Sequence, residues 1–315
     1  MNIFITGIAG FIGFHLAQHL RKRGDVVVGC DNFNPYYSPE LKKERAKRLT
    51  GIEVINADIQ DLAKLEEIVQ KYQITHVVHL AAQAGVRYSK VNPQSYIDTN
   101  LNGFLQILEL IRRHPQIPLI YASSSSVYGL NEKVPFAESD PTDAPSSLYG
   151  ATKKSNELMA HSYHHLYGIS VTGLRFFTVY GPWGRPDMAY YSFTDAILKE
   201  KPIQIFNHGR MKRDFTYVDD IVQGTAAALD RSLPCEIFNL GNNQPEEILH
   251  LVHLLEQKLG KKAKVELLPD QLSEVPLTYA DSTKSQTLLG YNPQTSLDQG
   301  LDQFLSWYLE ACHVN

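Results

Sequence analysis

The sequence predicts an α/β fold with a doubly wound parallel sheet and a smaller, discontinuous α/β lobe toward the C-terminus. Short runs rich in β-branched and aromatic residues alternate with helical patterns between residues 2 and 176. Alternation at this spacing is typical of βαβ units, in which neighbouring strands run parallel. A glycine-rich turn joins the first run to the first helical pattern, an arrangement that opens many such sheets.

The first unit combines a buried strand, Asn2–Thr6, with the turn Gly7-Ile8-Ala9-Gly10-Phe11-Ile12-Gly13. Glycines spaced by three allow a tight turn, close approach of backbone N–H groups to a phosphate, and close packing of helix on strand. The next strand, 26–30, is closed by Asp31, 18 residues beyond Gly13. A carboxylate there accepts hydrogen bonds from an adenosine ribose and would repel a 2′-phosphate, so NAD is favoured over NADP. The alternative is a glycine-rich loop with an incidental Asp, which the order of strand, glycines, helix, strand and acid disfavours.

The later elements continue the alternation. The patterns predict strands at 52–56, 75–80, 119–122, 171–176, 236–240 and 264–268, helices at 62–72, 100–113, 149–167, 192–199 and 246–259, a helix that ends at 229, and short helices after 281. Asp58 and Ile59 follow the third strand, in position to meet an adenine. Ala81 and Ala82 end the fourth strand, and their small side chains let a ring lie against the backbone. The Gly/Pro/aromatic loop 180–188 is too long and rigid to be a mere connector.

Two stretches carry the candidate chemistry. Tyr149 and Lys153 are four residues apart on a predicted helix and therefore share one face. A phenol titrates near pH ~10, but a nearby ammonium favours the phenolate and lowers the pKa, which makes the phenol a usable base. A surface Tyr and Lys is the ordinary alternative for this short motif alone. The run Ser123–Ser126, which ends a strand at the ligand-binding edge, favours the catalytic interpretation.

Composition excludes several classes of function. The 315 residues carry a net charge of −4, and the longest basic cluster, Lys42 to Arg48, is interpreted as a solvated helix face, so no nucleic-acid partner is indicated. Three distant cysteines, Cys30, Cys235 and Cys312, fit reduced thiols in a cytoplasmic protein. No signal peptide is recognised and no apolar run approaches membrane-spanning length, so no membrane association is predicted.

A metal site is also not predicted. His161, His164 and His165 have a spacing that would place three imidazoles on one side of a helix. However, no nearby carboxylate or cysteine completes a ligand set. A solvated or partly packed helix face is the preferred interpretation.

These motifs together resemble the extended short-chain dehydrogenase/reductase family. The resemblance spans nearly the whole chain and uses the glycine turn, Leu80-Ala81-Ala82, the serine run before Val127-Tyr128-Gly129, and Tyr149-x-x-x-Lys153. Three further segments, 84–89, 175–188 and 206–217, are similar to those of the UDP-glucuronate 4-epimerases. The family implies a Rossmann-fold NAD-binding domain, a tightly held NAD, and a UDP-sugar between two lobes. We expect the NAD-binding domain at 1–178 and 214–240, and the UDP-sugar-binding lobe at 179–213 and 241–315.

The resemblance also implies roles for individual residues. Tyr149 as phenolate takes the proton of the sugar 4-OH while C4 passes hydride to the nicotinamide. Lys153 holds the phenolate charge and the nicotinamide ribose, and Ser124 aligns with the catalytic Ser/Thr. The predicted cofactor-binding residues are Gly7, Ala9, Gly10, Phe11, Ile12, Gly13, Asp31, Asn32, Asp58, Ile59, Leu80, Ala81, Ala82, Gln83, Asn100, Tyr149, Lys153 and Phe176. The predicted substrate-binding residues are Arg87, Ser125, Ser126, Thr178, Arg185 and Arg213.

A uronate substrate would impose one further requirement. Its 4-keto intermediate is a β-keto acid, which loses CO₂ when the carboxylate bond aligns with the carbonyl π system. We expect donors near Ser125, Ser126 and Thr178 to hold the carboxylate out of that alignment. Arg87 and Arg185 are expected near the sugar or diphosphate, and Arg213 is the main candidate for a bidentate phosphate clamp. A surface ion pair is the alternative for each arginine, and it is weakest for Arg185 in its Gly/Pro loop.

Side chains that other members of the family carry are absent here, which reduces the number of reactions to be expected. Family dehydratases and decarboxylases carry carboxylates at the positions of Ser125 or Ser126, and UDP-galactose 4-epimerases usually carry Asn at that of Thr178. We therefore predict 4-epimerisation of UDP-glucuronate to UDP-galacturonate by a homodimer packed through the helices that begin at Asn100 and Tyr149. The alternatives are epimerisation of a neutral or N-acetylated UDP-hexose, and a nucleotide-sensing protein that lost activity. Leu272-Ser273-Glu274-Val275 replaces the family's Pro-Gly-Asp-Val and leaves the uridine contacts open.

Overall fold

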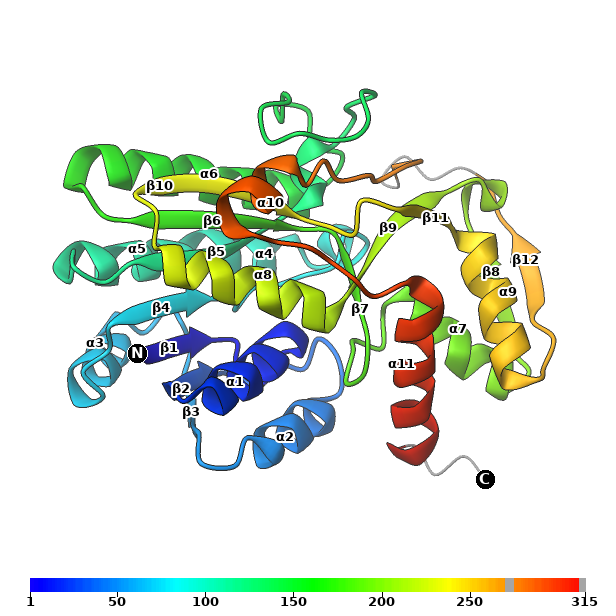
Figure 1. The fold of residues 1–315 in the computed structure, drawn as a ribbon, viewed down its shortest axis with the longest axis horizontal. Helices are drawn as coiled ribbons and strands as arrows, with labels where there is room; N and C mark the ends of the chain where they lie inside the picture. Colours follow the sequence, from blue (N-terminus) through cyan, green and yellow to red (C-terminus); the bar gives the residue numbers. More distant parts are fainter. Residues whose placement is uncertain (270–274, 312–315) are drawn as a thin grey trace.

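The computed structural model describes residues 1–269 and 275–311 (Figure 1). Within them, one sheet has seven parallel strands in the order β10-β6-β5-β4-β1-β2-β3. The strands are β1 (Asn2–Thr6), β2 (Val26–Asp31), β3 (Glu53–Asn56), β4 (His76–His79), β5 (Leu119–Ser124), β6 (Val171–Phe176) and β10 (Cys235–Leu240). The strand order runs outward from β1 to both edges of the sheet, through β2 to β3 on one side and from β4 to β10 on the other. This is the order of a doubly wound sheet, so the predicted fold class is confirmed.

Helices cover both faces of this sheet (Figure 1). The helices of the N-terminal part are α1 (Phe11–Arg23), α2 (Pro39–Arg48), α3 (Leu62–Lys71), α4 (Pro93–Tyr96), α5 (Phe104–Arg113), α6 (Leu148–Tyr167) and α8 (Val218–Arg231). Apolar residues of α1 and α8 share one core cluster with β1, whereas those of α3, α5 and α6 share a second cluster. The sheet therefore separates two hydrophobic cores and leaves the carboxyl ends of its strands open to a ligand.

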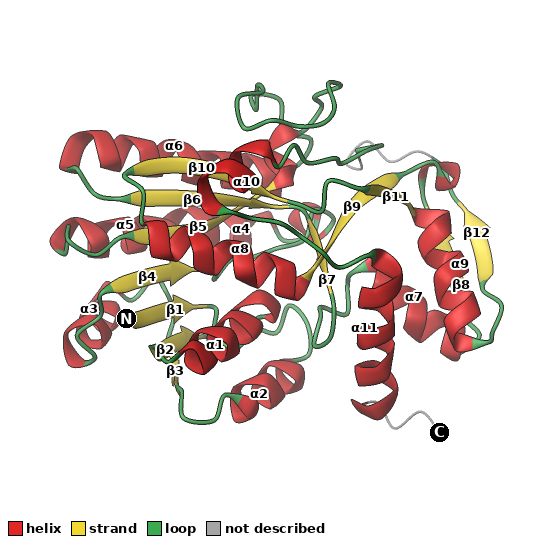
Figure 2. Cartoon of the chain, viewed as in Figure 1, coloured by secondary structure: helices red, strands yellow, loops and turns green. Residues whose placement is uncertain are grey.

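The smaller part of the structure lies beyond those carboxyl ends (Figure 2). It contains the sheets β11-β9-β7 and β12-β8. Its elements are β7 (Thr178–Tyr180), α7 (Ala189–Leu198), β8 (Pro202–Ile205), β9 (Lys212–Tyr217), β11 (Pro245–Glu247), α9 (Ile248–Leu259), β12 (Lys264–Leu267) and α11 (Leu297–Ala311). Helix α10 (Thr283–Leu289) lies between β12 and α11 in the chain and packs on α8 and β10 of the larger part. Among the described residues, no helix is both long and apolar enough to cross a membrane.

Three local expectations were wrong. The helix predicted at 100–113 starts earlier, because α4 runs through a π-helical turn, Ile97–Gly103, into α5. No strand was predicted between residues 176 and 236, but β7, β8 and β9 lie in this stretch. The basic cluster on α2 is only partly a solvated face, because Lys42 and Arg45 are buried whereas Lys43, Lys47 and Arg48 are exposed. In the divergent segment 272–275, the first three residues lie outside the described part of the chain.

Candidate active site

Helix α6 carries Tyr149 and Lys153 and begins at a side-chain cap. Ser147 Oγ accepts a hydrogen bond from Gly150 N at 3.1 Å, which satisfies one of the free N–H groups of the first turn. A Cβ at Gly150 would lie 2.5 Å from the carbonyl oxygen of Ser126. The helix start can therefore pack directly on the serine run only because residue 150 is glycine. This contact brings the Tyr149 turn to the end of β5.

The end of β5 presents the serines. Ser124 Oγ donates to Ser126 Oγ at 3.2 Å and accepts from Ser126 N at 3.2 Å. Ser124, Tyr149 and Lys153 line one cavity together with the glycine-rich turn. The structure thus brings the three predicted catalytic residues to one place from two separate elements, β5 and α6.

Burial dominates the electrostatics of the Tyr–Lys pair. Burial raises the pKa of Tyr149, against the opposing effects of a hydrogen bond with Ser124 and the charge of Arg185. Burial also lowers the pKa of Lys153 to about 8, and Lys153 Nζ donates to Ala122 O at 2.9 Å. The hydrogen bond with Ser124 and the charge of Arg185 both favour the phenolate form of Tyr149, and the predicted effect of Lys153 on this pKa stays a prediction. Ionisation of Tyr149 therefore depends on groups from β5 and from the loop 181–188.

The glycine-rich turn fits a dinucleotide. Gly7 has φ +71°, and a Cβ there would lie 2.7 Å from Ala81 N. A Cβ at Gly13 would lie 2.3 Å from Gly7 O, so α1 packs on the turn without room for a side chain. Gly10 caps α1 and has no side chain to occupy the first N–H groups of the helix, and Gly10, Phe11, Ile12 and Gly13 line the cavity. Open N–H groups at a helix N-terminus suit a pyrophosphate.

Asp31 lies at the adjoining end of the same cavity. Its Oδ1 accepts from Phe33 N at 2.8 Å, and Lys42 Nζ lies 3.5 Å from the same oxygen. Asn32 Nδ2 donates to Asp58 Oδ2 at 2.9 Å. A carboxylate held at a strand end in this way retains a free oxygen for ribose hydroxyls. Lys42 is a lining residue that the sequence did not single out, because its contact with Asp31 forms only through the packing of α2.

Arg185 enters the cavity opposite the glycine turn. It forms a bidentate pair with Asp187, from Nε at 3.0 Å and from Nη2 at 2.5 Å. Tyr36 Oη donates to Asp187 Oδ2 at 2.9 Å, so the loop after β2 touches the loop 181–188. The guanidinium charge is thereby held beside the cavity and near the Tyr149 phenol.

Most of the predicted site residues meet in this cavity. The lining includes Gly7, Gly10, Phe11, Ile12, Gly13, Asp31, Asn32, Ile59, Leu80, Ala81, Ala82, Gln83, Ser124, Tyr149, Lys153, Phe176 and Arg185. Eight predicted residues are not part of the lining: Ala9, Asp58, Arg87, Asn100, Ser125, Ser126, Thr178 and Arg213. Asn100 stands behind it, where its side chain bonds Gln83 N at 2.8 Å and Gln83 O at 3.0 Å. Arg87 stacks on the Phe206 ring at 4.6 Å.

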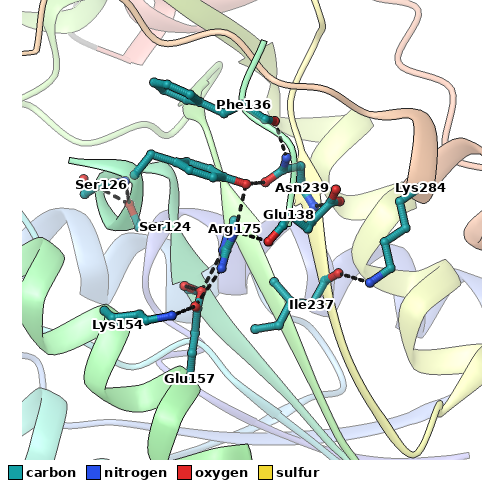
Figure 3. A network of polar contacts seen from close by, with 12 residues as sticks. Ser124, Ser126, Phe136, Glu138, Lys154, Glu157, Arg175, Ile237, Asn239 and Lys284 are labelled. Carbon is teal, nitrogen blue, oxygen red and sulfur yellow. Dashed lines mark hydrogen bonds and ion pairs between the residues drawn. The ribbon is translucent and has the colours of Figure 1, made fainter. Parts of the chain in front are cut away.

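A buried polar network supports β5 from behind (Figure 3). Arg175 forms two bonds of 2.8 Å with Glu157, which also accepts from Ser123 Oγ at 2.6 Å. Arg175 Nη1 donates to Tyr128 Oη at 2.9 Å, and Tyr128 Oη donates to Asn239 Oδ1 at 2.7 Å. The network joins β5, β6, β10 and α6 next to Ser124. Sequence reasoning missed it, because Glu157 and Arg175 are 18 residues apart on different elements.

Comparison with known proteins finds relatives that match nearly the whole chain. Residues 3–241 match the model of the NAD dependent epimerase/dehydratase family. UDP-glucuronate 4-epimerase 4 of Arabidopsis thaliana is 50% identical over 98% of this chain and 75% of its own length. The structure of UDP-glucuronic acid 4-epimerase from Bacillus cereus, in complex with UDP-glucuronic acid and NAD, has a TM-score of 0.93 at 38% identity, covering 99% of this chain and 100% of that one. UDP-glucose 4-epimerase from Thermotoga maritima, with UDP-glucose, has a TM-score of 0.89 at 31% identity over 99% and 100%.

Proposed function

The chain belongs to the NAD-dependent epimerase/dehydratase family, and we propose that it is an isomerase that inverts C4 of UDP-glucuronate to give UDP-galacturonate. The observation that carries the proposal is the single cavity in which Ser124, Tyr149 and Lys153 meet the glycine-rich turn. The 50% identity to a UDP-glucuronate 4-epimerase over nearly the whole chain supports the choice of sugar.

NAD is the cofactor, and when bound it supplies the acceptor and donor of the C4 hydride. The turn from Gly7 to Gly13 would hold its pyrophosphate, and Asp31 its adenosine ribose. Tyr149 as phenolate takes the proton of the sugar 4-OH, and Ser124 Oγ hydrogen-bonds the same oxygen. Lys153, where it is protonated, stabilises the phenolate. The resulting 4-keto sugar turns about its diphosphate bonds and regains hydride on its other face, so no net oxidation occurs.

The remaining predicted contacts belong to this proposal. We propose that the other predicted cofactor-binding residues bind or support the dinucleotide, with Asn100 acting through Gln83, and that Arg87, Thr178, Arg185 and Arg213 contact the UDP-sugar. The NAD-binding domain comprises 1–178 and 214–240, and the sugar-binding lobe 179–213 and 241–315. The position of β10 in the seven-stranded sheet supports the return of the chain to the first domain.

Retention of the carboxylate is the difficult part of uronate chemistry. Ser125 and Ser126 present hydroxyls where family dehydratases and decarboxylases carry carboxylates. Elimination and decarboxylation therefore lack an acid/base group at this position. We assign to Ser125, Ser126 and Thr178 the task of holding the sugar carboxylate out of alignment with the 4-keto π system.

The test is incubation of the purified protein with UDP-glucuronate, UDP-glucose and UDP-N-acetylglucosamine, without added cofactor. We expect UDP-galacturonate from UDP-glucuronate, because NAD stays bound through the cycle. If UDP-glucose or UDP-N-acetylglucosamine turned over faster than UDP-glucuronate, the proposed substrate would be wrong. If none of the sugars gave turnover or NADH-like absorbance, the protein would instead be a nucleotide sensor without activity.

We also propose a homodimer packed through α6 and the segment from Asn100 to Arg113. Helix α6 leaves Leu158, Leu166 and Tyr167 exposed at 56%, 66% and 47%, which is apolar surface that a second copy would bury. Light scattering should give twice the chain mass of 35.6 kDa. Leu166→Glu should shift the measured mass toward that of one chain. If the variant stayed dimeric, the interface would not involve this surface of α6.

A cytoplasmic location completes the proposal. Cys30 is buried and Cys235 half-buried, and both are free thiols. Reduced thiols suit a reducing compartment. Cell fractionation that recovers the protein with membranes or outside the cell would contradict this assignment.

A further inference from the structure

Arg45, in the middle of α2, is the largest fully buried side chain of the described residues, at 0% exposure. Burial of a guanidinium is costly unless every donor finds an acceptor. Among the described residues none forms an ion pair with Arg45, so its charge is met by carbonyl and hydroxyl oxygens and by the Tyr37 ring, 5.5 Å away. A charge kept in so costly a place indicates a task that other residues cannot perform.

The partners of Arg45 come from three segments: the glycine-rich turn, the loop between β2 and α2, and the loop 181–188. Nη1 donates to Ala9 O at 3.0 Å, within the glycine-rich turn, and to Tyr37 Oη at 2.7 Å. Nε and Nη2 donate to Trp183 O at 3.0 Å and 2.6 Å, and Nη2 also donates to Gly184 O at 3.1 Å. One planar group thus spans the turn assigned to the pyrophosphate and the loop that carries Arg185.

The same loop is held on its other side by α1. His15 Nε2 lies 2.9 Å from Pro182 O, so its ring N–H donates to the carbonyl that precedes Trp183 O. Three successive carbonyls, at 182, 183 and 184, therefore accept hydrogen bonds from side chains of α1 and α2. Trp183 has φ +58°, a conformation that costs a non-glycine residue energy and persists only where surrounding contacts impose it. Arg185 directly follows Gly184, the third of these residues, and it lines the cavity.

We propose that Arg45 is a positioning residue that fixes Arg185 relative to the glycine-rich turn and thereby sets the affinity for the anionic sugar nucleotide. This inference rests on the proposed function of the site. Lysine cannot replace arginine here. A guanidinium is planar and donates from three nitrogens to the glycine-rich turn and to the loop 182–185 at once, whereas an ammonium is a compact group that cannot bridge the two. Arg45 itself touches neither NAD nor sugar, so its effect passes through the loop 182–185.

Steady-state kinetics of Arg45→Lys tests the proposal. We expect KM for UDP-glucuronate to rise about tenfold, while kcat, measured above the acid limb of its pH profile where Tyr149 is ionised, changes less than about threefold, since Ser124, Tyr149 and Lys153 lie on other elements. Calorimetric titration of the NAD-loaded enzyme with UDP-glucuronate should show the same loss of affinity. Lys47→Met is the matched control, because Lys47 lies on the same helix with its side chain 70% exposed, and it should leave both values unchanged.

A double-mutant cycle separates positioning from general loss of stability. In an Arg185→Gln background, Arg45→Lys should change KM less than about twofold, because the group that it positions is already absent. Equal tenfold effects in both backgrounds, or a kcat loss without a KM change, would overturn the proposal. If the wild type prefers a neutral UDP-hexose, the proposed function fails, and the same cycle with that sugar still decides the role of Arg45.

Discussion

The buried pair of Glu157 and Arg175 allows a sharp prediction about what holds the catalytic strand. Both side chains are 4% exposed, and the two 2.8 Å bonds use both carboxylate oxygens. In Glu157→Gln, one oxygen becomes an NH₂ group that faces a guanidinium N–H, and the charge of Arg175 remains buried without a counterion. Removal of one partner of a buried pair costs about 3–5 kcal/mol. The variant should therefore lose about that much free energy of unfolding.

Urea titration followed by circular dichroism measures the effect. Glu44→Gln is the control, since Glu44 pairs with Lys47 on an exposed helix surface and its removal should leave the midpoint unchanged. Because Glu157 also holds Ser123, next to Ser124, kcat of Glu157→Gln should fall as well. A stability loss below about 1 kcal/mol, with wild-type kcat, would refute the supporting role of this network.

Three further predictions concern the site and its frame. Tyr149→Phe should lower kcat by about 10²- to 10⁴-fold. NAD, measured by absorbance after denaturation, should stay bound, and a variant with wild-type turnover would show that Tyr149 is not the base. Because the Arg185 charge lowers the pKa of Tyr149, Arg185→Gln should raise that pKa and move the acid limb of kcat against pH to higher pH; an unmoved limb would contradict this coupling. Asp214 is fully buried and accepts from Asn242 N, Asn243 N and Ala280 N at 2.6, 3.1 and 3.0 Å. Asp214→Asn would point an amide N–H at these donors and should cost about 2–3 kcal/mol of unfolding free energy in a urea titration, a loss that wild-type stability would disprove.

The sequence predicted the parts of the site that local chemistry defines. The glycine turn, Asp31, Ser124 and the Tyr149–Lys153 pair each lie at a strand end or a helix start, where the strand–helix alternation already fixes the edge of the sheet. Their gathering in one cavity follows from topology alone. The seven-stranded parallel sheet was predictable for the same reason.

The parts that sequence reasoning missed depend on contacts between distant segments. Arg45 looks like one member of an exposed basic cluster until Trp183, 138 residues away, supplies its acceptors. Strand β9 begins with charged residues and forms because β7 and β11 pair with it. The pKa of Tyr149 likewise depends on Arg185, which only the fold brings near. A charged residue in a sequence gives no sign of the distant carbonyl or carboxylate that will bury it.

The fate of the hydrogen at C4 decides whether the hydride leaves and returns within one active site. The protein would be incubated with UDP-glucuronate deuterated at C4, without added cofactor, and the product would be analysed by NMR. We expect UDP-galacturonate that retains deuterium at C4, because NAD takes up the hydride and returns it without leaving the protein. Deuterium lost to water, or a product unchanged at C4, would contradict it.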